Sequence, residues 1–248
     1  LIMTHSPRKE NDSDDDEWRL NAICISPHTL VNQWKESAEK FFGSNMRVLV
    51  FDKVTQITKR SWAELKDAHL IICSDKFILN PKAKKALDSA VRKLMGGESS
   101  QHMNKVCRRI TDPEKWTDQM RKDIPVHPLL PRYTVVFIDE FCALFKEGTK
   151  GYLQHQRLWR PVKTLADNAL SVFAASATPG LGCRWMLERL IDLISVHPCQ
   201  TVNLSYAIPV DLQKQFIRKC TIAHNPSFPV PRLDTDTVWV DLSRAEQV

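Results

Sequence analysis

The stretch Val135-Val-Phe-Ile-Asp-Glu140 is a run of apolar residues that ends abruptly in two acids. A second run, Leu170-Ser-Val-Phe-Ala-Ala-Ser-Ala-Thr-Pro179, ends in small polar residues. Short runs of β-branched and aromatic residues that stop in this way are typical of buried parallel strands. The carboxyl ends of such strands meet at one edge of an open α/β sheet, where ligands gather. The sequence therefore predicts a parallel sheet with a polar site at the ends of these two strands.

The Asp139-Glu140 pair suits nucleoside triphosphate chemistry. One carboxylate can hold Mg²⁺, and its neighbour can orient or deprotonate an attacking water. Taken alone, an acidic pair after an apolar run is more often a solvated strand end. A third stretch, Ala22-Ile-Cys-Ile-Ser-Pro-His-Thr-Leu-Val-Asn-Gln-Trp34, predicts a strand that breaks at Ser26-Pro27 into an amphipathic helix ending near Gly43. Because the Asp139-Glu140 pair suits nucleoside triphosphate chemistry, ATP is the first ligand to expect.

These three blocks, in this order, resemble motifs Ia, II and III of superfamily-two helicases, and most closely those of the Swi/Snf-type chromatin-remodelling ATPases. In that family motif Ia carries a proline, a Leu-Val pair and a Gln-Trp or Asn-Trp. Motif II reads Asp-Glu-x-His, and motif III reads Ser/Gly-x-Thr-Pro. The resemblance covers most of residues 20–248 and includes Ala68–Asp75, which is similar to the strand before motif Ib.

The resemblance implies roles for the residues that match the motifs. Asp139 would hold Mg²⁺ and Glu140 would act on the attacking water, so this acidic pair and the two motif III residues would form the nucleotide site. Ser176 and Thr178 would link nucleotide state to the grip on DNA. The nucleic-acid contacts at the strand ends would be Ser26, Pro27, His28 and Ser74.

The sequence departs from the family at two places. Cys142 stands where motif II usually has His, a residue that couples nucleotide state to motif III. There is also no phosphate-binding loop, because none of the 7 glycines belongs to a Gly-x-x-x-x-Gly-Lys-Ser/Thr motif. In the family that loop would fall just before Leu1-Ile-Met-Thr4, which we expect to be the last turn of the following helix. We therefore expect weak or absent binding of ATP and Mg²⁺ by this chain.

The net charge of +6 is concentrated in residues 82–122, which hold 11 Lys or Arg against 5 Asp or Glu. Two helices are expected there, one begun by Asn80-Pro81 and ended by Gly96-Gly97, and one begun by Asp112-Pro113-Glu114. A further short helical piece is expected between them, at 101–110. Basic residues on such helices can contact phosphates, or they can simply be a solvated surface. The candidate phosphate contacts are Lys84, Lys85, Arg108 and Arg109.

The predicted fold class is α/β: a RecA-like parallel sheet with helices on both faces and a basic helical insertion at 82–122. Residues 1–19 would be the end of a helix and an acidic loop, and 20–248 the first RecA-like lobe. Residues 226–248 would close that lobe and begin a linker to a second one. Strands are expected at 20–26, 46–51, 69–74, 134–139, 170–176 and 235–240, and helices at 29–42, 62–67, 159–168 and 184–195.

Composition indicates in which cell compartment the protein works and whether it has a membrane partner. The 7 cysteines are odd in number and lack any Cys-x-x-Cys, which indicates reduced thiols and, with the resemblance, a nuclear location. No apolar run approaches the roughly twenty residues of a membrane span, so no membrane partner is expected. Trp34 lies at helical spacing with Leu30, Ala38 and Phe41, which predicts a core anchor.

The function that the sequence favours is the amino-terminal ATPase lobe of a DNA-dependent, Snf-type translocase. Its partners would be double-stranded DNA or chromatin and a second RecA-like lobe of the same parent chain. It would hydrolyse ATP only in that longer context and would be inactive as the isolated chain. The alternative is a non-catalytic DNA- or protein-binding module derived from such a lobe.

Overall fold

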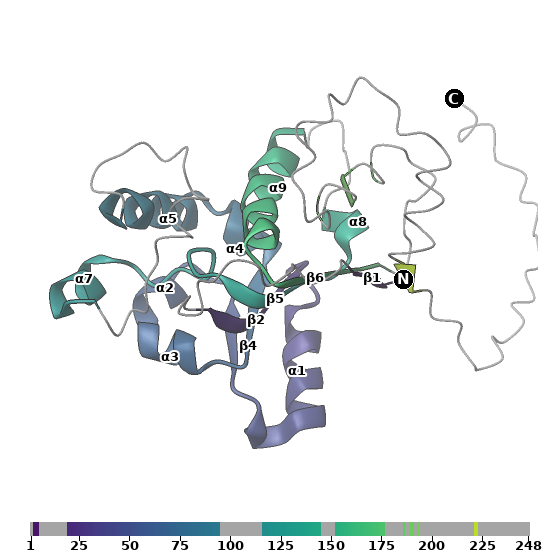
Figure 1. Cartoon of the computed structure of the whole chain (residues 1–248), viewed down its shortest axis with the longest axis horizontal. Helices are drawn as coiled ribbons and strands as arrows, with labels where there is room; N and C mark the ends of the chain where they lie inside the picture. Colours follow the sequence, from purple (N-terminus) through teal and green to yellow (C-terminus); the bar gives the residue numbers. More distant parts are fainter. Residues whose placement is uncertain are drawn as a thin grey trace, which may run out of the picture.

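A seven-stranded sheet forms the centre of the computed structural model, with the strand order β3-β4-β2-β5-β6-β1-β7 (Figure 1). The structure describes residues 2–4, 19–94, 116–144, 152–176, 186, 189, 190, 193 and 221–222. The strands are β1 Ile2–Thr4, β2 Leu20–Ser26, β3 Val48–Phe51, β4 Leu70–Ser74, β5 Tyr133–Ile138, β6 Ser171–Ala175 and β7 Thr221–Ile222.

Five neighbouring strands, β3, β4, β2, β5 and β6, run parallel. Strand β4, Leu70-Ile-Ile-Cys-Ser74, is buried at every position, as expected of a strand that is covered on both faces. The predicted α/β class, a RecA-like parallel sheet with helices, is confirmed. The strands expected at 20–26, 46–51, 69–74, 134–139 and 170–176 are all present, with ends shifted by at most two residues.

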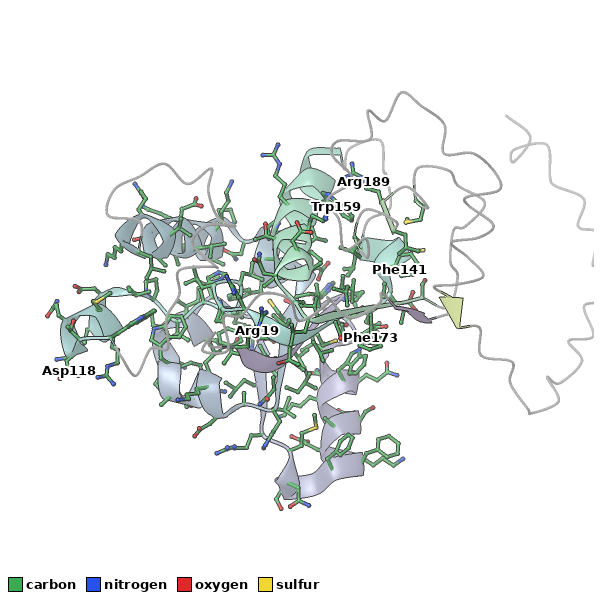
Figure 2. All side chains as sticks on the ribbon, viewed as in Figure 1. Arg19, Asp118, Phe141, Trp159, Phe173 and Arg189 are labelled. Atoms are coloured by element: carbon green, nitrogen blue, oxygen red, sulfur yellow. The ribbon has the colours of Figure 1, made fainter. Side chains whose placement is uncertain are left out.

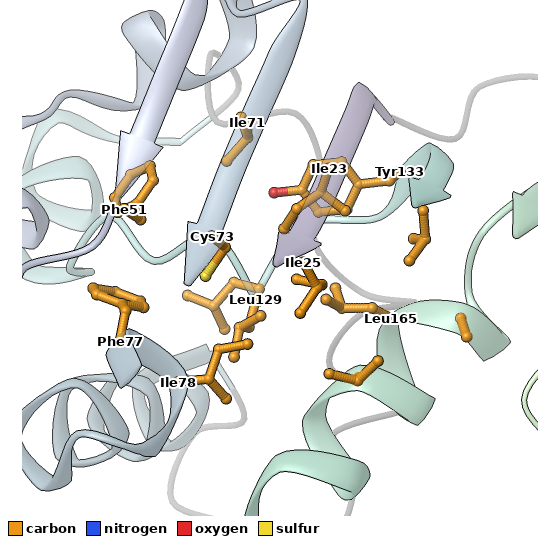
Figure 3. Close-up of a cluster of buried hydrophobic side chains, with 14 of the residues drawn as sticks. Ile23, Ile25, Phe51, Ile71, Cys73, Phe77, Ile78, Leu129, Tyr133 and Leu165 are labelled. Atoms are coloured by element: carbon orange, nitrogen blue, oxygen red, sulfur yellow. The ribbon is translucent and has the colours of Figure 1, made fainter. Parts of the chain in front are cut away.

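Helices cover both faces of the sheet. They are α1 Val31–Phe42, α2 Gln56–Lys59, α3 Trp62–Asp67, α4 Asp75–Leu79, α5 Pro81–Leu94, α7 Asp118–Asp123, α8 Phe141–Leu144 and α9 Tyr152–Asp167. Helix α1 buries Val31 and Ala38 against Cys24 and Ile72 on one face. On the other face, Phe77 of α4 and Leu165 of α9 belong to a larger core, which Figure 3 shows around the sheet.

Arg189 packs against Trp159 of α9. The backbone is helical at Met186, Arg189, Leu190 and Leu193, within the helix expected at 184–195. The Arg189 guanidinium carbon lies 4.8 Å from the centre of the Trp159 ring, and Figure 2 shows the two side chains together. This contact allows a cation–π attraction that helps to hold the segment on α9.

One prediction about the start of the chain is wrong. Residues Ile2–Thr4 are not the last turn of a helix but strand β1, which pairs antiparallel with both β6 and β7. Ile2 lies opposite Ala175 of β6 and Ile222 of β7. Three residues are too few to show a helical or strand period, and here the unpaired edge of β6 supplies partners for their backbone groups.

The predicted start of the second basic helix, Asp112-Pro113-Glu114, lies outside the described residues. Within the described residues α7 starts at Asp118, and its N-cap is Thr117, whose hydroxyl accepts the Met120 N–H at 3.2 Å. A threonine hydroxyl in this position satisfies a free N–H group of the first turn. The first basic helix begins at Pro81 as predicted.

Several expectations fall outside the described residues. They are the acidic loop before residue 19, the helical piece at 101–110, Arg108 and Arg109, Thr178, and the closing segment at 226–248. Within the part that is described, no helix combines the length and the apolar character needed to cross a membrane.

Candidate functional site at the carboxyl edge of the sheet

The strand register brings the polar strand ends into one row. Ser26 of β2 lies opposite Ser74 of β4, and Ile25 lies opposite Ile138 of β5. Asp139 is therefore next to Ser26 in the sheet, and its backbone N–H donates to the Ile25 carbonyl at 2.9 Å. The structure thus assembles, at one edge, the strand ends that the sequence singled out.

Asp139 is held by hydrogen bonds to both carboxylate oxygens. The Trp34 indole N–H donates to Oδ2 at 2.6 Å, and the Glu140 backbone N–H donates to Oδ1 at 3.0 Å. The side chain is only partly buried. A carboxylate offers about four acceptor positions, so each oxygen keeps capacity for a cation or a water.

Trp34 does more than the core anchoring that the sequence predicts. Its ring packs edge-on against Phe137 of β5, with ring centroids 5.1 Å apart, while its N–H reaches Asp139. Sequence reasoning missed this bond. The available signal was chemical: an indole that packs against a sheet needs an acceptor for its N–H, and α1 follows the strand that neighbours β5.

Glu140 joins the ends of β5 and β6. Its Oε2 accepts a hydrogen bond from the Ser176 hydroxyl at 3.1 Å, and Ser176 is 3% exposed. Glu140 also has φ of 46°, the left-handed region that residues with a Cβ rarely adopt. Backbone strain of this kind gathers at ligand sites. The bond between Glu140 and Ser176 links the ends of the two strands that the sequence singled out.

The ends of β2 and β4 are different in character, because their serine hydroxyls are buried. The Ser26 hydroxyl donates to the Pro27 carbonyl at 3.3 Å, and the Ser74 hydroxyl accepts the Phe77 N–H at 3.0 Å as the N-cap of α4. Both side chains are 0% exposed. Their predicted contact with nucleic acid is not tested by this geometry, which gives Ser74 a capping role.

His28 is the exposed residue of this junction. Its backbone N–H donates to Asp75 Oδ1 at 2.8 Å, and its Nδ1 lies 3.7 Å from the same oxygen. Sequence reasoning did not single out Asp75, although it directly follows Ser74. Pro27 is partly exposed. Of the four predicted nucleic-acid contacts at the strand ends, Pro27 and His28 are therefore the two that a large ligand could reach from solvent.

The basic helices form a separate surface. Lys84 and Lys85 are exposed on α5, and Figure 1 shows α5 and α7 at the opposite end of the sheet from β6 and β1. The Lys93 ammonium group donates to the Asp123 carbonyl at 2.6 Å and so ties α5 to α7. Lys84 and Lys85 are therefore not brought into the Asp139 site.

The buried cysteines are not reactive groups of the site. Burial raises the pKa of the Cys24 thiol well above its ordinary value, and the negative charge of Asp139 adds to the effect. Burial likewise raises the pKa of Cys73. Thiols need their thiolate form to act as nucleophiles or metal ligands. Cys142, the departure from motif II, is partly buried and packs against the large core.

The carboxylates suit Mg²⁺ only as part of a larger ligand set. Among the described residues, no group of three or more His, Cys, Asp or Glu could hold a metal ion. Mg²⁺ in nucleotide sites commonly takes one or two carboxylates and completes its shell with phosphate oxygens and water. Asp139 fits that pattern through its remaining acceptor positions. No phosphate cradle lies within the described residues.

Comparisons with known proteins give a distant structural likeness. No family model and no curated protein matches the chain. Among solved structures, it is similar to the Sulfolobus solfataricus SWI2/SNF2 ATPase core in complex with dsDNA, with 14% identity and a TM-score of 0.45. The match covers 80% of this chain and 31% of that chain, so this chain spans about a third of its length.

Proposed function

We propose that this chain is the first RecA-like ATPase lobe of a DNA-dependent, Snf-type translocase that remodels protein–DNA complexes. The observation that carries the proposal is the pairing of Asp139-Glu140 with Ser176 across the ends of β5 and β6. An acidic pair at the edge of a parallel sheet, bonded to the next strand, can respond to a bound phosphate and transmit the change along the sheet.

The proposed roles follow from what each group can reach. Asp139 is the ligand for Mg²⁺, because it keeps acceptor positions beyond the two it uses. Glu140 orients or deprotonates the attacking water, and its bond to Ser176 reports the state of that site to β6. Bound Mg²⁺-ATP would supply the electrophilic phosphorus. Without a phosphate loop, the affinity of this chain for ATP is expected to be no tighter than about millimolar.

Duplex DNA or chromatin is the proposed partner, together with a second RecA-like lobe and a nuclear location. Two surfaces are available for phosphates: the Pro27-His28 junction beside the acidic site, and Lys84 and Lys85 on α5. Contacts to DNA phosphates release counterions, which makes the affinity fall steeply with salt.

The nucleotide part is tested by ligand-observed NMR with millimolar ATP. The wild-type chain should show Mg²⁺-dependent saturation transfer to ATP. Asp139→Asn should remove the dependence on Mg²⁺, because an amide is a poor ligand for this ion. Glu140→Gln should keep binding, because the amide preserves the shape and loses only the base. If transfer does not depend on Mg²⁺ in the wild type, the nucleotide is not held at Asp139.

The DNA part is tested by fluorescence anisotropy of a labelled duplex at several salt concentrations. The double variant Lys84→Glu with Lys85→Glu should lower the slope of log affinity against log salt by about one unit per lost phosphate contact. The control Lys53→Glu with Lys59→Glu makes the same charge change at exposed residues near α2. Equal slopes for the two double variants would mean that α5 is a solvated surface that does not contact DNA phosphates.

A non-catalytic binding module remains the second candidate. One observation favours it: both Asp139 oxygens already accept hydrogen bonds from the protein, which gives the carboxylate a structural use without any ligand. This candidate predicts duplex binding with the same salt dependence but no Mg²⁺-dependent contact with ATP. The NMR experiment with ATP therefore separates the two candidates.

A further inference from the structure

The hydrogen bond between Trp34 and Asp139 joins two residues that are 105 positions apart in the chain. Trp34 lies on α1, and Asp139 follows β5. An N···O distance of 2.6 Å is at the short end for such a bond, as expected when the acceptor carries a charge. The indole N–H is donor only, so it cannot exchange roles with the carboxylate.

The Trp34 indole is held in place by its ring contact with Phe137 and by the packing of α1 on the sheet. Phe137 and Asp139 are two residues apart along the chain direction of β5, so their side chains leave the same face. The Trp34 ring packs edge-on against Phe137 and places its N–H at the next position on that face. Helix α1 is held to the sheet by buried Val31 and Ala38, on either side of Trp34. The donor is thus preorganised.

Asp139 has a second fixed donor, the Glu140 N–H on Oδ1. With one donor on each oxygen, the plane of the carboxylate is set, and its unused acceptor positions point in fixed directions. Groups that hydrogen-bond to a metal ligand commonly orient it and tune its affinity. A second donor from a different element is more than the strand end needs for local stability.

We propose that Trp34 is a positioning residue for the divalent-cation ligand Asp139: its indole N–H fixes the carboxylate in the orientation that accepts the cation. This inference rests on the proposed function, since it assumes that Asp139 is the ligand. It adds a residue of α1 to a site otherwise built from the ends of β5 and β6. It also makes the cation site depend on the helix that begins at the Pro27-His28 junction.

The test is Mn²⁺ titration of the folded chain, followed by paramagnetic broadening of the Glu140 and Phe141 backbone amides. Trp34→Phe keeps an aromatic ring on Phe137 and removes the donor. It should weaken Mn²⁺ binding by about tenfold, the lower end of the usual effect of such supporting groups. The matched control is Trp62→Phe, which removes an indole N–H bonded to the Ile124 carbonyl at 3.1 Å in the large core. Its Mn²⁺ affinity should equal that of the wild type.

The outcomes separate this inference from the proposed function. If Trp34→Phe binds Mn²⁺ as the wild type does while Asp139→Asn does not bind, Trp34 has no positioning role and the cation site stands. If the wild type shows no broadening that Asp139→Asn removes, the cation site fails and the role of Trp34 fails with it. Equal weakening by Trp34→Phe and Trp62→Phe would mean a general loss of stability and would also overturn the inference.

A measurement on the wild type covers the case in which Trp34→Phe does not fold. The Trp34 indole proton should resonate downfield, because its acceptor is charged. Saturating Mg²⁺ should move it upfield, since the cation withdraws charge from the bonded carboxylate. An indole proton that does not move while the Glu140 amide responds to Mg²⁺ would overturn the role of Trp34.

Discussion

Strands β4 and β5 both end in polar residues that lead directly into a short helix, α4 after Ser74 and α8 after Asp139-Glu140. At the end of β4 the backbone is unstrained, and the Ser74 hydroxyl caps α4 in an ordinary extended conformation. At the end of β5 the two carboxylates are bonded to Trp34 and Ser176, which come from other elements, and Glu140 has a positive φ. A bond from another segment occurs at the β4 end too, where the His28 N–H donates to Asp75. The positive φ and the two side-chain bonds to Asp139 and Glu140 are found at the β5 end, and they are what the proposed cation site would use.

The largest effect expected at the β4 end is sensitivity to acid. His127 is 1% exposed, and its ring centroid lies 5.3 Å from that of Phe77 on α4. Burial lowers the pKa of His127 from 6.5 to about 3. The unfolded chain therefore binds more protons between these values. The contribution of neutral His127 to the free energy of unfolding is complete above pH 6.5. It is lost as the pH falls toward 3, by at most about 1.4 kcal/mol per pH unit.

This pH dependence is checked by urea unfolding between pH 4.5 and 7.5. The variant His127→Asn keeps an acceptor for the Leu129 N–H, which His127 Nδ1 binds at 3.2 Å, and has no ring to protonate. Its free energy of unfolding should vary less with pH than that of the wild type. The control His69→Asn changes an exposed histidine and should keep the wild-type slope. Parallel curves for wild type and His127→Asn would contradict the assignment.

A smaller effect is expected from Ser74→Ala. Loss of an N-cap hydroxyl costs about 1 kcal/mol of stability, and here the bonded Phe77 N–H is buried. Mn²⁺ broadening near Asp139 should not change. Thr117→Ala removes an equivalent cap from the exposed helix α7 and should cost less. If Ser74→Ala weakened the cation site without lowering stability, the contrast between the two strand ends would be wrong.

The smallest effect concerns the backbone of Glu140. Both Glu140→Gly and Glu140→Ala delete the bond to Ser176, but only glycine adopts a φ of 46° without strain. The glycine variant should therefore be more stable than the alanine variant by about 0.5 to 1 kcal/mol. At exposed Ala143 in α8 the order should be the usual one, with Ala143→Gly destabilising. Thermal unfolding of the three variants decides whether the strain is real.

Much of the parallel sheet could be predicted because its strands are long and nearly all apolar. Leu20–Ser26 and Trp62–Asp67 agree with their predicted bounds, and α1 ends at Gly43, whose φ is 58°. The gathering of Ser26, Ser74 and Asp139 at one edge also followed from the sequence, since parallel strands place their carboxyl ends together. These features depend on local pattern and on general topology.

Other features depend on contacts that no local pattern encodes. The strand at Ile2–Thr4 exists because β6, which lies far along the chain at Ser171–Ala175, offers an edge. Helical spacing placed Trp34 on the buried side of α1 but could not show that its N–H meets Asp139. The burial of Ser26 and Ser74 likewise follows from the packing around the strand ends, which spacing alone does not give.

The pairing of β1 with β6 and β7 has a kinetic consequence. Strand β2 pairs with β4 and β5, which are closer to it along the chain. Ile2 must instead pair with Ala175, and most of the chain lies between these two residues. The entropy cost of closing a loop rises with its length, and contacts between distant residues slow folding. Strand β1 is too short to repay this cost until β6 is already ordered. We therefore expect β1 to join the sheet after β6, and β7, which pairs with β1, to join with it or after it.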